Sequence, residues 1–208
     1  MERLAVNLAQ PDESGLARAV EQLRAGGVIA YPTETLYGLG VDIRRSGALK
    51  RLCRLKGRSA EKAMAVVVSE RGMLEPWVQV SERAEALIAA YWPGPLTLIL
   101  PAKPAVPRAL LAGGIGLGVR VPGLPLAREL CRRLGGPITA TSANLSGGPE
   151  PKSAEQVAQA LGSGLDLLLD AGPLPAGQAS TVLDLSGPRP RLLREGAIAR
   201  DVLAPYLN

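Results

Sequence analysis

The fold of this chain is decided by one stretch of its sequence, GGVIAYPTETLYGLGVD at residues 26–42. Residues 28–31 form a short apolar run, and Pro32 stops it because the residue before a proline is restricted in conformation. Small hydroxyl residues and glycines follow, and such residues let backbone amides approach a ligand closely. We therefore predict a buried strand that ends in a ligand-binding loop, although the same composition also fits an ordinary turn.

Helical and strand-like patterns alternate on both sides of this stretch. Asp12 and Ser14 supply N-cap chemistry for a helix that ends at Gly26. Further helices are expected at residues 46–55, 81–92, 125–134 and 153–161, and strands at 64–69, 96–100, 118–121, 138–141, 165–170, 181–185 and 192–194. The late strands follow one another with few helices between them, which indicates that part of the sheet is antiparallel. The prediction is an α/β fold with a twisted mixed sheet flanked by helices.

Length and composition favour one globular domain over residues 1–208, with no repeat or dividing linker. The chain is 47% hydrophobic and 21% charged, with a mean hydropathy of +0.13, so it can bury enough apolar surface to fold. It contains no histidine. This excludes Ser-His-Asp triads and histidine-containing zinc sites. Cys53 and Cys131 are expected to be buried thiols, because their separation fits neither a CxxC pair nor a disulfide framework.

Two further features concern location and charge. The N-terminus lacks an apolar core of signal-peptide length, and apolar runs such as residues 63–68 fall far short of the roughly 18 residues of a membrane helix, so a cytoplasmic protein is expected. The net charge is +5. Residues 44–62 carry eight basic side chains and one acid, a local charge of +7. Such a run is usually a solvated helix face, but it also fits an anionic partner.

Two motifs have side chains suited to phosphate. Lys56, Arg58 and Lys62 precede an apolar strand, and cations at a strand mouth fit a polyphosphate. No Walker A sequence is present, which argues against a P-loop ATPase. In the second motif, residues 138–147, Ser142, Asn144 and Ser146 alternate. If the backbone stays extended, they project to one side and can bind phosphate or ribose, although such a cluster also fits a turn.

Taken together and in order, six segments resemble the YrdC-like family of threonylcarbamoyl-AMP synthases, over about residues 14–198. They are GGVIAYPTETLYGLGVD, Lys56-x-Arg58, Gly118-Val-Arg-Val-Pro122, Ser142-x-Asn144, Ser180-Thr-Val-Leu-Asp184 and Leu193-Arg-Glu-Gly-Ala-Ile198. The resemblance implies a twisted α/β sheet with a concave, positively charged face. It also implies an enzyme that joins L-threonine, bicarbonate or CO2, and ATP into L-threonylcarbamoyl-adenylate and releases pyrophosphate. A separate tRNA threonylcarbamoyl transferase then acts at adenosine 37, and Mg2+ is expected as the companion of ATP.

The resemblance also implies site residues. The threonine site comprises Thr33, Arg120, Ala140 and Thr181, with Arg120 pairing with the carboxylate. The ATP site comprises Lys56, Arg58, Lys62, Ser142, Asn144 and Arg194. Lys56 and Arg58 are the implied catalytic pair, because they would neutralise the triphosphate as pyrophosphate leaves. The group that deprotonates the threonine amine is not assigned by the sequence.

Departures from the family pattern keep other functions open. Val67 and Lys62 stand where longer members have histidine and asparagine, and Glu150 stands where a small hydroxyl residue is common. One alternative is a module that binds double-stranded RNA or tRNA through the basic segment. Another is a paralogue of the same fold without synthase activity, because fold does not fix function. Pyrophosphate release from ATP, threonine and bicarbonate distinguishes these alternatives from the synthase.

Overall fold

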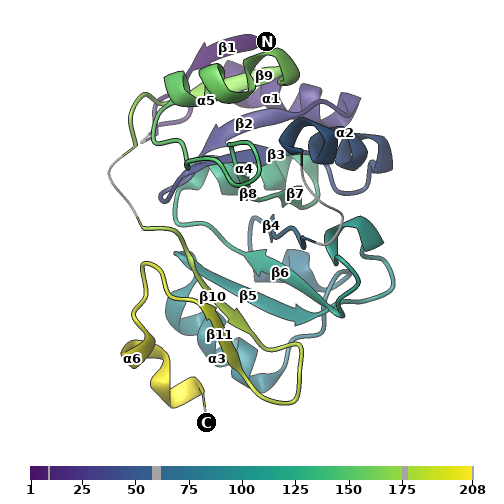
Figure 1. The fold of residues 1–208 in the computed structure, drawn as a ribbon, viewed down its shortest axis with the longest axis vertical. Coiled ribbons are helices and arrows are strands. Elements are labelled where there is room, and N and C mark those ends of the chain that lie inside the picture. Colours follow the sequence, from purple (N-terminus) through teal and green to yellow (C-terminus); the bar gives the residue numbers. More distant parts are fainter. Residues whose placement is uncertain (9, 58–61, 175–177, 208) are drawn as a thin grey trace.

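The computed structural model describes residues 1–8, 10–57, 62–174 and 178–207. Its strands form two mixed sheets that follow one another along the longest axis of the molecule, with the N-terminus at one end and the C-terminus at the other (Figure 1). The first sheet has the order β1 (Glu2–Ala5), β9 (Leu167–Asp170), β2 (Ile29–Pro32), β3 (Tyr37–Gly40) and β8 (Thr141–Ser142). The second has the order β11 (Arg191–Arg194), β10 (Thr181–Asp184), β5 (Leu96–Pro101), β6 (Gly116–Arg120), β4 (Val66–Val67) and β7 (Ile138–Thr139).

The expected α/β class with a mixed sheet is confirmed, but the strands are divided between two sheets. In the first sheet, β2 is parallel to β9 and antiparallel to β3, and in the second, β5 is parallel to β10 and antiparallel to β6. The division occurs inside the single strand expected at 138–141. Residues 138–139 pair with β4, whereas 141–142 pair with β3. The chain therefore passes from one sheet to the other at Ala140.

Local capping signals mark both ends of the first helix. Asp12 caps α1 (Glu13–Ala25) by accepting a hydrogen bond from the Gly15 backbone N–H, and Gly26 ends it at a φ of +85°. The helix expected at 125–134 has the same bounds in the structure. The remaining helices are α2 (Ser46–Lys56), α3 (Glu82–Tyr91), α4 (Pro125–Leu134), α5 (Ala154–Leu161) and the short α6 (Arg200–Leu203). Within the described ranges, no helix is both long and apolar enough to span a bilayer.

Two strands were not expected from the sequence, β1 and β3. Residues 37–40 pair with β2 as a hairpin, where the sequence indicated a loop or turn. The sequence does not indicate this strand, because Gly38 and Gly40 have low strand propensity. Their role is steric: a Cβ on Gly40 would lie 3.0 Å from the Tyr31 ring. The glycines therefore make room for a fully buried tyrosine.

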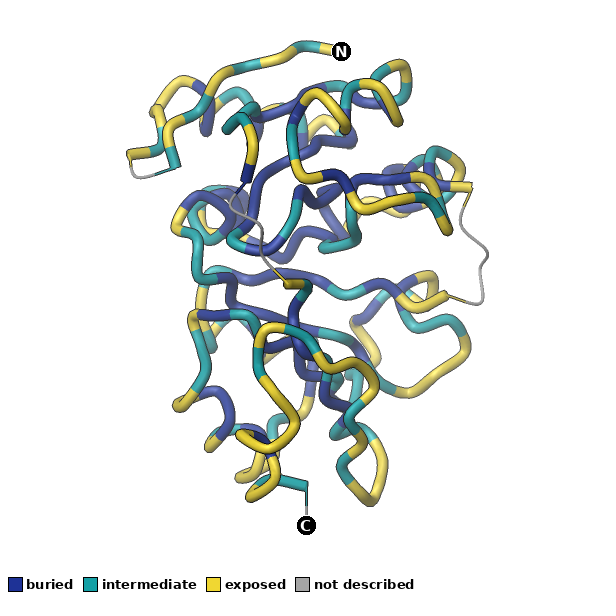
Figure 2. The backbone as a smooth tube through the Cα atoms, turned by 60° about the vertical axis from the view of Figure 1, so that its left-hand side comes forward, coloured by how far each residue is buried: buried dark blue, intermediate teal, exposed yellow. Residues whose placement is uncertain are grey.

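Buried side chains form two clusters, and buried residues run through the strands of both sheets (Figure 2). The larger cluster combines β3, β5 and β6 with α2, α3 and α5. In the smaller, α1 and α4 pack against the β2 and β9 side chains of the first sheet. Both cysteines are free thiols, as expected, and Cys131 is buried, but Cys53 is only half-buried where a buried thiol was expected.

Thr139 links the two sheets by hydrogen bonds. It lies on β7 of the second sheet, and its side chain is fully buried. Thr139 Oγ1 donates to the Leu39 carbonyl at 2.9 Å and accepts from the Val41 N–H at 3.1 Å. The Tyr31 hydroxyl donates to the Thr139 carbonyl at 2.9 Å. These contacts fix the first sheet relative to the second, next to the crossing at Ala140.

Candidate active site

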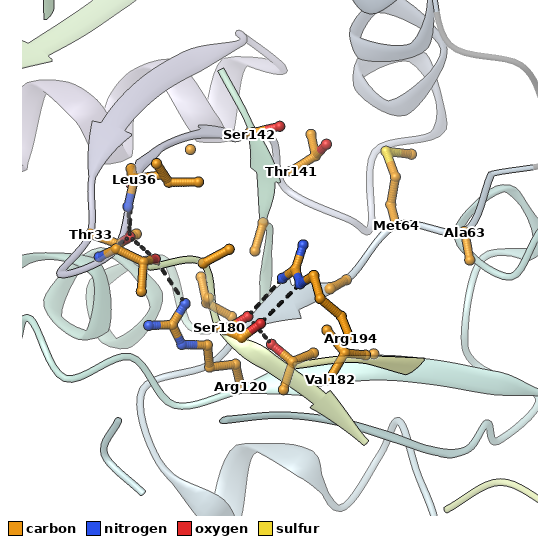
Figure 3. Close-up of a pocket in the computed structure, with 18 of the residues that line it drawn as sticks. Thr33, Leu36, Ala63, Met64, Arg120, Thr141, Ser142, Ser180, Val182 and Arg194 are labelled. Atoms are coloured by element: carbon orange, nitrogen blue, oxygen red, sulfur yellow. Dashed lines mark hydrogen bonds between the residues drawn. The ribbon is translucent and has the colours of Figure 1, made fainter. Parts of the chain in front are cut away.

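A cavity of about 350 Å³ is lined by residues of both sheets (Figure 3). The first sheet contributes the β2–β3 hairpin and β8, and the second contributes β5, β6, β10 and β11. Among the described lining residues, the cationic side chains are Arg120 and Arg194 and the acidic one is Glu150. The cavity therefore combines two guanidinium groups with hydroxyls and apolar walls, which suits an anionic ligand.

The hairpin loop at residues 33–36 is ordered by threonine hydroxyls. Thr33 Oγ1 donates to the Leu36 carbonyl at 2.7 Å and accepts from the Leu36 N–H at 3.1 Å. Thr35 Oγ1 lies 2.9 Å from Thr33 Oγ1, and both threonines line the cavity. Thr33, whose implied contact with threonine stays a prediction, thus lines the cavity, and Thr35 is a neighbouring hydroxyl that the sequence analysis missed.

Arg120 extends from the end of β6 toward this loop, and only 6% of the residue is exposed (Figure 3). Its Nε donates to the Gly94 carbonyl at 2.9 Å, and its Nη1 donates to Thr35 Oγ1 at 3.2 Å. Its Nη2 forms an ion pair with Glu34. These three contacts hold the guanidinium plane in a defined orientation at the cavity wall.

Glu34 joins the hairpin loop to the residues before α4. Its carboxylate accepts hydrogen bonds from the backbone N–H groups of Gly123 at 2.7 Å and Leu124 at 3.3 Å. Burial raises the pKa of this carboxyl, but the charge of Arg120 and the hydrogen bond from Gly123 outweigh burial and hold the pKa below its usual value. Glu34 is therefore ionised at neutral pH.

Arg194, on β11, reaches the cavity from the second sheet and contacts Ser180. Its Nε donates to the Ser180 carbonyl at 3.0 Å and its Nη2 to Ser180 Oγ at 3.1 Å (Figure 3). Ser180 Oγ also lies 2.9 Å from Thr97 Oγ1. Burial lowers the pKa of Arg194, whereas the negative charge of Glu150 acts in the opposite direction. Arg194 thus provides an exposed cation on the cavity wall, where an anionic ligand can bind.

The structure places Thr181 differently from the implied threonine contact. Ser180 and Val182 line the cavity, and Thr181 lies between them on a strand where side chains alternate. Its fully buried Oγ1 donates to the Ile198 carbonyl at 2.7 Å and accepts from the N–H groups of Gly196 and Ile198. In this structure Thr181 anchors the segment after β11, and Ser180 is the hydroxyl that faces the cavity.

The row of Ser142, Asn144 and Ser146 does not form, because the backbone stops being extended after Ser142. Asn144 Oδ1 accepts from Ser142 Oγ at 2.6 Å, and its Nδ2 donates to the Gly148 carbonyl at 2.6 Å. Gly147 closes the turn at a φ of +84°. Ser142 lines the cavity, whereas the Asn144 side chain holds the 142–148 loop together.

Lys56 is 2% exposed at the end of α2 and contacts that same loop. Its ammonium group donates to the carbonyls of Ser142 and Asn144 and to Asn144 Oδ1, the second and third at 2.7 and 3.4 Å. An ammonium has three N–H donors. These contacts join the end of α2 to the 142–144 segment, so the geometry gives Lys56 a role in positioning this loop.

The other residues named from the sequence differ in whether they line the cavity. Ala140 and Val67 line it, and Ala140 N donates to the Ala65 carbonyl at 2.8 Å. Glu150 also lines the cavity and is exposed, and its negative charge acts on Arg194. Lys62 is exposed and is not one of the described lining residues. Arg58 lies outside the described residues, so its assignment stays a prediction.

Curated relatives of high similarity carry one name. The chain is 41% identical over 195 residues to threonylcarbamoyl-AMP synthase of Bacillus subtilis, a match that covers 93% of this chain and 56% of that protein. It is also 41% identical over 179 residues to threonylcarbamoyl-AMP synthase of Stenotrophomonas maltophilia, covering 84% of this chain and 96% of that protein. The chain thus spans about half the length of the Bacillus relative and nearly all of the Stenotrophomonas relative.

A solved structure and a family model agree with these relatives. The crystal structure of Pyrococcus abyssi Sua5 complexed with L-threonine superimposes with a TM-score of 0.94 at 34% identity, covering 100% of this chain and 61% of that one. The Sua5/YciO/YrdC family model, described as telomere recombination, matches residues 21–196. The fold, the cavity and these matches together show that the chain belongs to the Sua5/YciO/YrdC family.

Proposed function

We propose that this protein is an L-threonylcarbamoyl-adenylate synthase, which converts L-threonine, bicarbonate or CO2, and ATP into L-threonylcarbamoyl-AMP and pyrophosphate. The observation that carries the proposal is the cavity between the β2–β3 hairpin and Arg120, in a chain that superimposes on a Sua5 bound to L-threonine. Two guanidinium groups line this cavity. They match a ligand set that is anionic throughout: a threonine carbamate and a nucleoside triphosphate.

The threonine half of the site is assigned to the hairpin side of the cavity. Arg120 binds the carboxylate of threonine, with Thr33 and the backbone at Ala140 beside it. We assign Ser180, the residue immediately before β10, in place of Thr181 as the hydroxyl that contacts the ligand, because Ser180 is among the described residues that line the cavity and Thr181 is not. This arrangement orients the threonine nitrogen, which carries the carbamate, for reaction with the nucleotide.

The nucleotide half is assigned to Arg194 and Ser142, with Lys56 and Asn144 behind Ser142. Lys62 and Arg58 remain predicted phosphate ligands. In the reaction a carbamate oxygen attacks the α-phosphorus, and the bond to the β-phosphate oxygen breaks as pyrophosphate leaves. Charge develops on phosphoryl oxygens, so positioning and electrostatic stabilisation by fixed cations supply the catalysis. The chemistry requires no histidine, and the chain has none.

Magnesium is proposed as the companion of ATP. Within the described part of the chain, no group of three or more Asp, Glu or Cys side chains could hold a metal ion. Mg2+ keeps several waters and binds ATP through phosphate oxygens. The side chains present therefore fit an ion that is held mainly by the nucleotide and water. When bound, the ion supplies positive charge beside the phosphates.

The product and its user belong to the same proposal. Threonylcarbamoyl-AMP is a mixed anhydride, so a second enzyme must transfer its acyl group. We propose that a tRNA threonylcarbamoyl transferase in the cytoplasm does so at adenosine 37 of tRNA, and that this chain performs the first step of that modification.

Direct RNA binding through residues 44–62 is less well supported. Arg44 forms an ion pair with the buried Asp42 at 2.8 Å, and Arg51 pairs with Asp166 at 2.7 Å. Together with the buried Lys56, at least three of the eight basic side chains are therefore engaged within the protein, which weakens the phosphate-binding surface that the alternative requires. A synthase-inactive paralogue is the other alternative, and a direct assay distinguishes it.

The test is pyrophosphate release by the purified protein. Release is expected only when ATP, threonine and bicarbonate are all present, because the carbamate must form before it attacks the α-phosphate. Serine should be a poorer substrate, since one methyl group in an apolar pocket contributes about 1 to 3 kcal/mol. Release at the same rate without an amino acid would contradict the proposal, and so would no release with the full set of substrates.

A further inference from the structure

Glu34 is a largely buried carboxylate that has no part in the proposed reaction. Its side chain is 26% exposed, that of its partner Arg120 is 7% exposed, and Glu34 is not one of the described residues that line the cavity. It therefore lies behind Arg120 as seen from the ligand. Burying a charge pair costs desolvation energy, so such a pair is weak evidence for stability alone and a specific role must be sought.

The hydrogen bonds of Arg120 show what that role is. A guanidinium has five N–H groups. Gly94 takes the Nε–H, Thr35 takes one on Nη1 and Glu34 takes one on Nη2. Within the described structure these contacts leave one N–H on each terminal nitrogen. Unused N–H groups on a held guanidinium can form charge-assisted hydrogen bonds to a carboxylate.

Glu34 itself is held from the opposite side. The backbone N–H groups of Gly123 and Leu124 both bind its carboxylate, at 2.7 and 3.3 Å. They belong to the segment between β6 and α4, whereas Glu34 belongs to the hairpin of the first sheet. The carboxylate is thus held both by its own hairpin and by the segment before α4. Its ion pair with Arg120 in turn restricts the position of the guanidinium.

We propose that Glu34 is a positioning residue that fixes Arg120 so that its two remaining N–H groups face the cavity and bind the carboxylate of the amino-acid substrate. The proposal rests on the proposed function, and it names a specificity determinant of the same site. Glu34 supplies orientation, and it also balances the charge of Arg120, so that recognition depends on the matched geometry of the two N–H groups. The readout is therefore threonine affinity, with ATP affinity as the internal reference.

The experiment compares Glu34→Gln, Glu34→Asp and the wild-type protein. Glutamine keeps the shape and one acceptor but removes the charge that orients Arg120. We expect Glu34→Gln to raise the KM and the calorimetric Kd for threonine by roughly 10- to 100-fold. The KM for ATP should change by less than about threefold. Glu34→Asp keeps the charge and should recover part of the threonine affinity.

A double-variant comparison separates positioning from a general structural role. If Glu34 acts through Arg120, Glu34→Gln should change threonine affinity by less than about twofold when Arg120 is already alanine. The matched control is Asp42→Asn, which neutralises another buried carboxylate that binds an arginine, Arg44, outside the cavity. This control should leave the threonine KM unchanged even where it lowers the melting temperature.

Three results would overturn the inference. They are an unchanged threonine affinity in Glu34→Gln, an equal loss of threonine and ATP affinity, and the same loss with and without Arg120. Calorimetry separates this inference from the proposed function. If the wild-type protein binds threonine but releases no pyrophosphate, the synthase proposal fails while the titrations still decide the role of Glu34. If it binds no threonine, both are wrong.

Discussion

A single buried lysine, Lys56, connects the end of α2 to the loop that follows β8. Taking an ammonium group out of water is costly unless each donor finds an acceptor, and here the acceptors are oxygens of Ser142 and Asn144. Sequence reasoning predicted a phosphate ligand at this position. That assignment stays a prediction, and the hydrogen bonds add a second role, the positioning of the 142–148 loop, whose Ser142 lines the cavity.

Replacing Lys56 with methionine is expected to destabilise the protein. The change leaves buried carbonyl oxygens without donors, which costs about 1 to 3 kcal/mol. The pyrophosphate-release rate should fall as well, because Ser142 loses its fixed position. Thermal unfolding and the release assay measure the two effects, and Lys50→Met, an exposed position on the same helix, is the control. A slower reaction with unchanged stability would instead indicate direct phosphate contact.

At the scale of elements, α1 and α4 are joined by an apolar contact and by a set of ion pairs at its edge. Leu16 and Leu23 of α1 and Leu126 and Leu130 of α4 belong to the same buried cluster. On α4, Glu129 binds Arg132 at 2.6 Å and Arg133 at 2.5 Å. Arg133 also pairs with Glu13 of α1. The ion pairs therefore connect two helices that the apolar contact already holds together.

The pH dependence of this network has a defined sign. Hydrogen bonds from Arg132 and then Arg133 lower the pKa of Glu129 from 4.5 to about 2. A lowered pKa in the folded state stabilises the protein above the unfolded value, and this contribution is lost as the pH falls from about 4.5 toward 2. The wild-type protein should melt slightly above Glu129→Gln at pH 7, by less than about 3 °C because ion pairs that water still reaches contribute little. The difference should disappear near pH 2, and a difference that persists there would contradict the assignment.

For the whole molecule, the site is a product of two sheets meeting, since neither sheet alone supplies the lining. The hairpin with Thr33 comes from one sheet, and Arg120 and Arg194 come from the other. A ligand in the cavity contacts both sheets and is bound only by the folded arrangement. Its binding free energy therefore adds to the stability of the entire fold.

Thermal unfolding with ligands tests this coupling. At a threonine concentration of about 100 times Kd, binding contributes about 2.7 kcal/mol. For a chain of this size that corresponds to a rise in melting temperature of about 5 to 10 °C. The rise caused by threonine should be lost in Arg120→Ala, while the rise caused by ATP with Mg2+ is largely kept. Loss of both rises together would place Arg120 outside the threonine half.

Local signals explain which parts of the fold could be predicted from the sequence. Asp12 and Gly26 bound one helix, and Pro125 bounds another, because capping is decided by neighbouring residues. The β3 strand could not be predicted, since its glycines are explained only by the distant Tyr31 ring. The crossing between sheets at Ala140 leaves no local mark either, because pairing partners far along the chain decide it.

The same distinction holds for the candidate site. Arg120, Arg194, Ser142 and Thr33 could be identified from sequence segments, and the structure brings them to one cavity. The choice between Ser180 and Thr181 could not, because both are small hydroxyl residues and only the sheet decides which one faces the ligand. Arg120 forms an ion pair with Glu34, which lies 86 residues away along the chain. No pattern in the sequence predicts that contact.

The link at Thr139 has a consequence for how substrates enter. Separating the sheets would break the buried hydrogen bonds of Thr139, which opposes movement of one half of the cavity relative to the other. The cavity is therefore preorganised. Binding then costs less conformational entropy than it would in a protein whose two halves close around the ligand. We expect a ligand to enter over the rim of the cavity without separation of the two sheets, so its association rate should depend on diffusion and on the charge at the entrance.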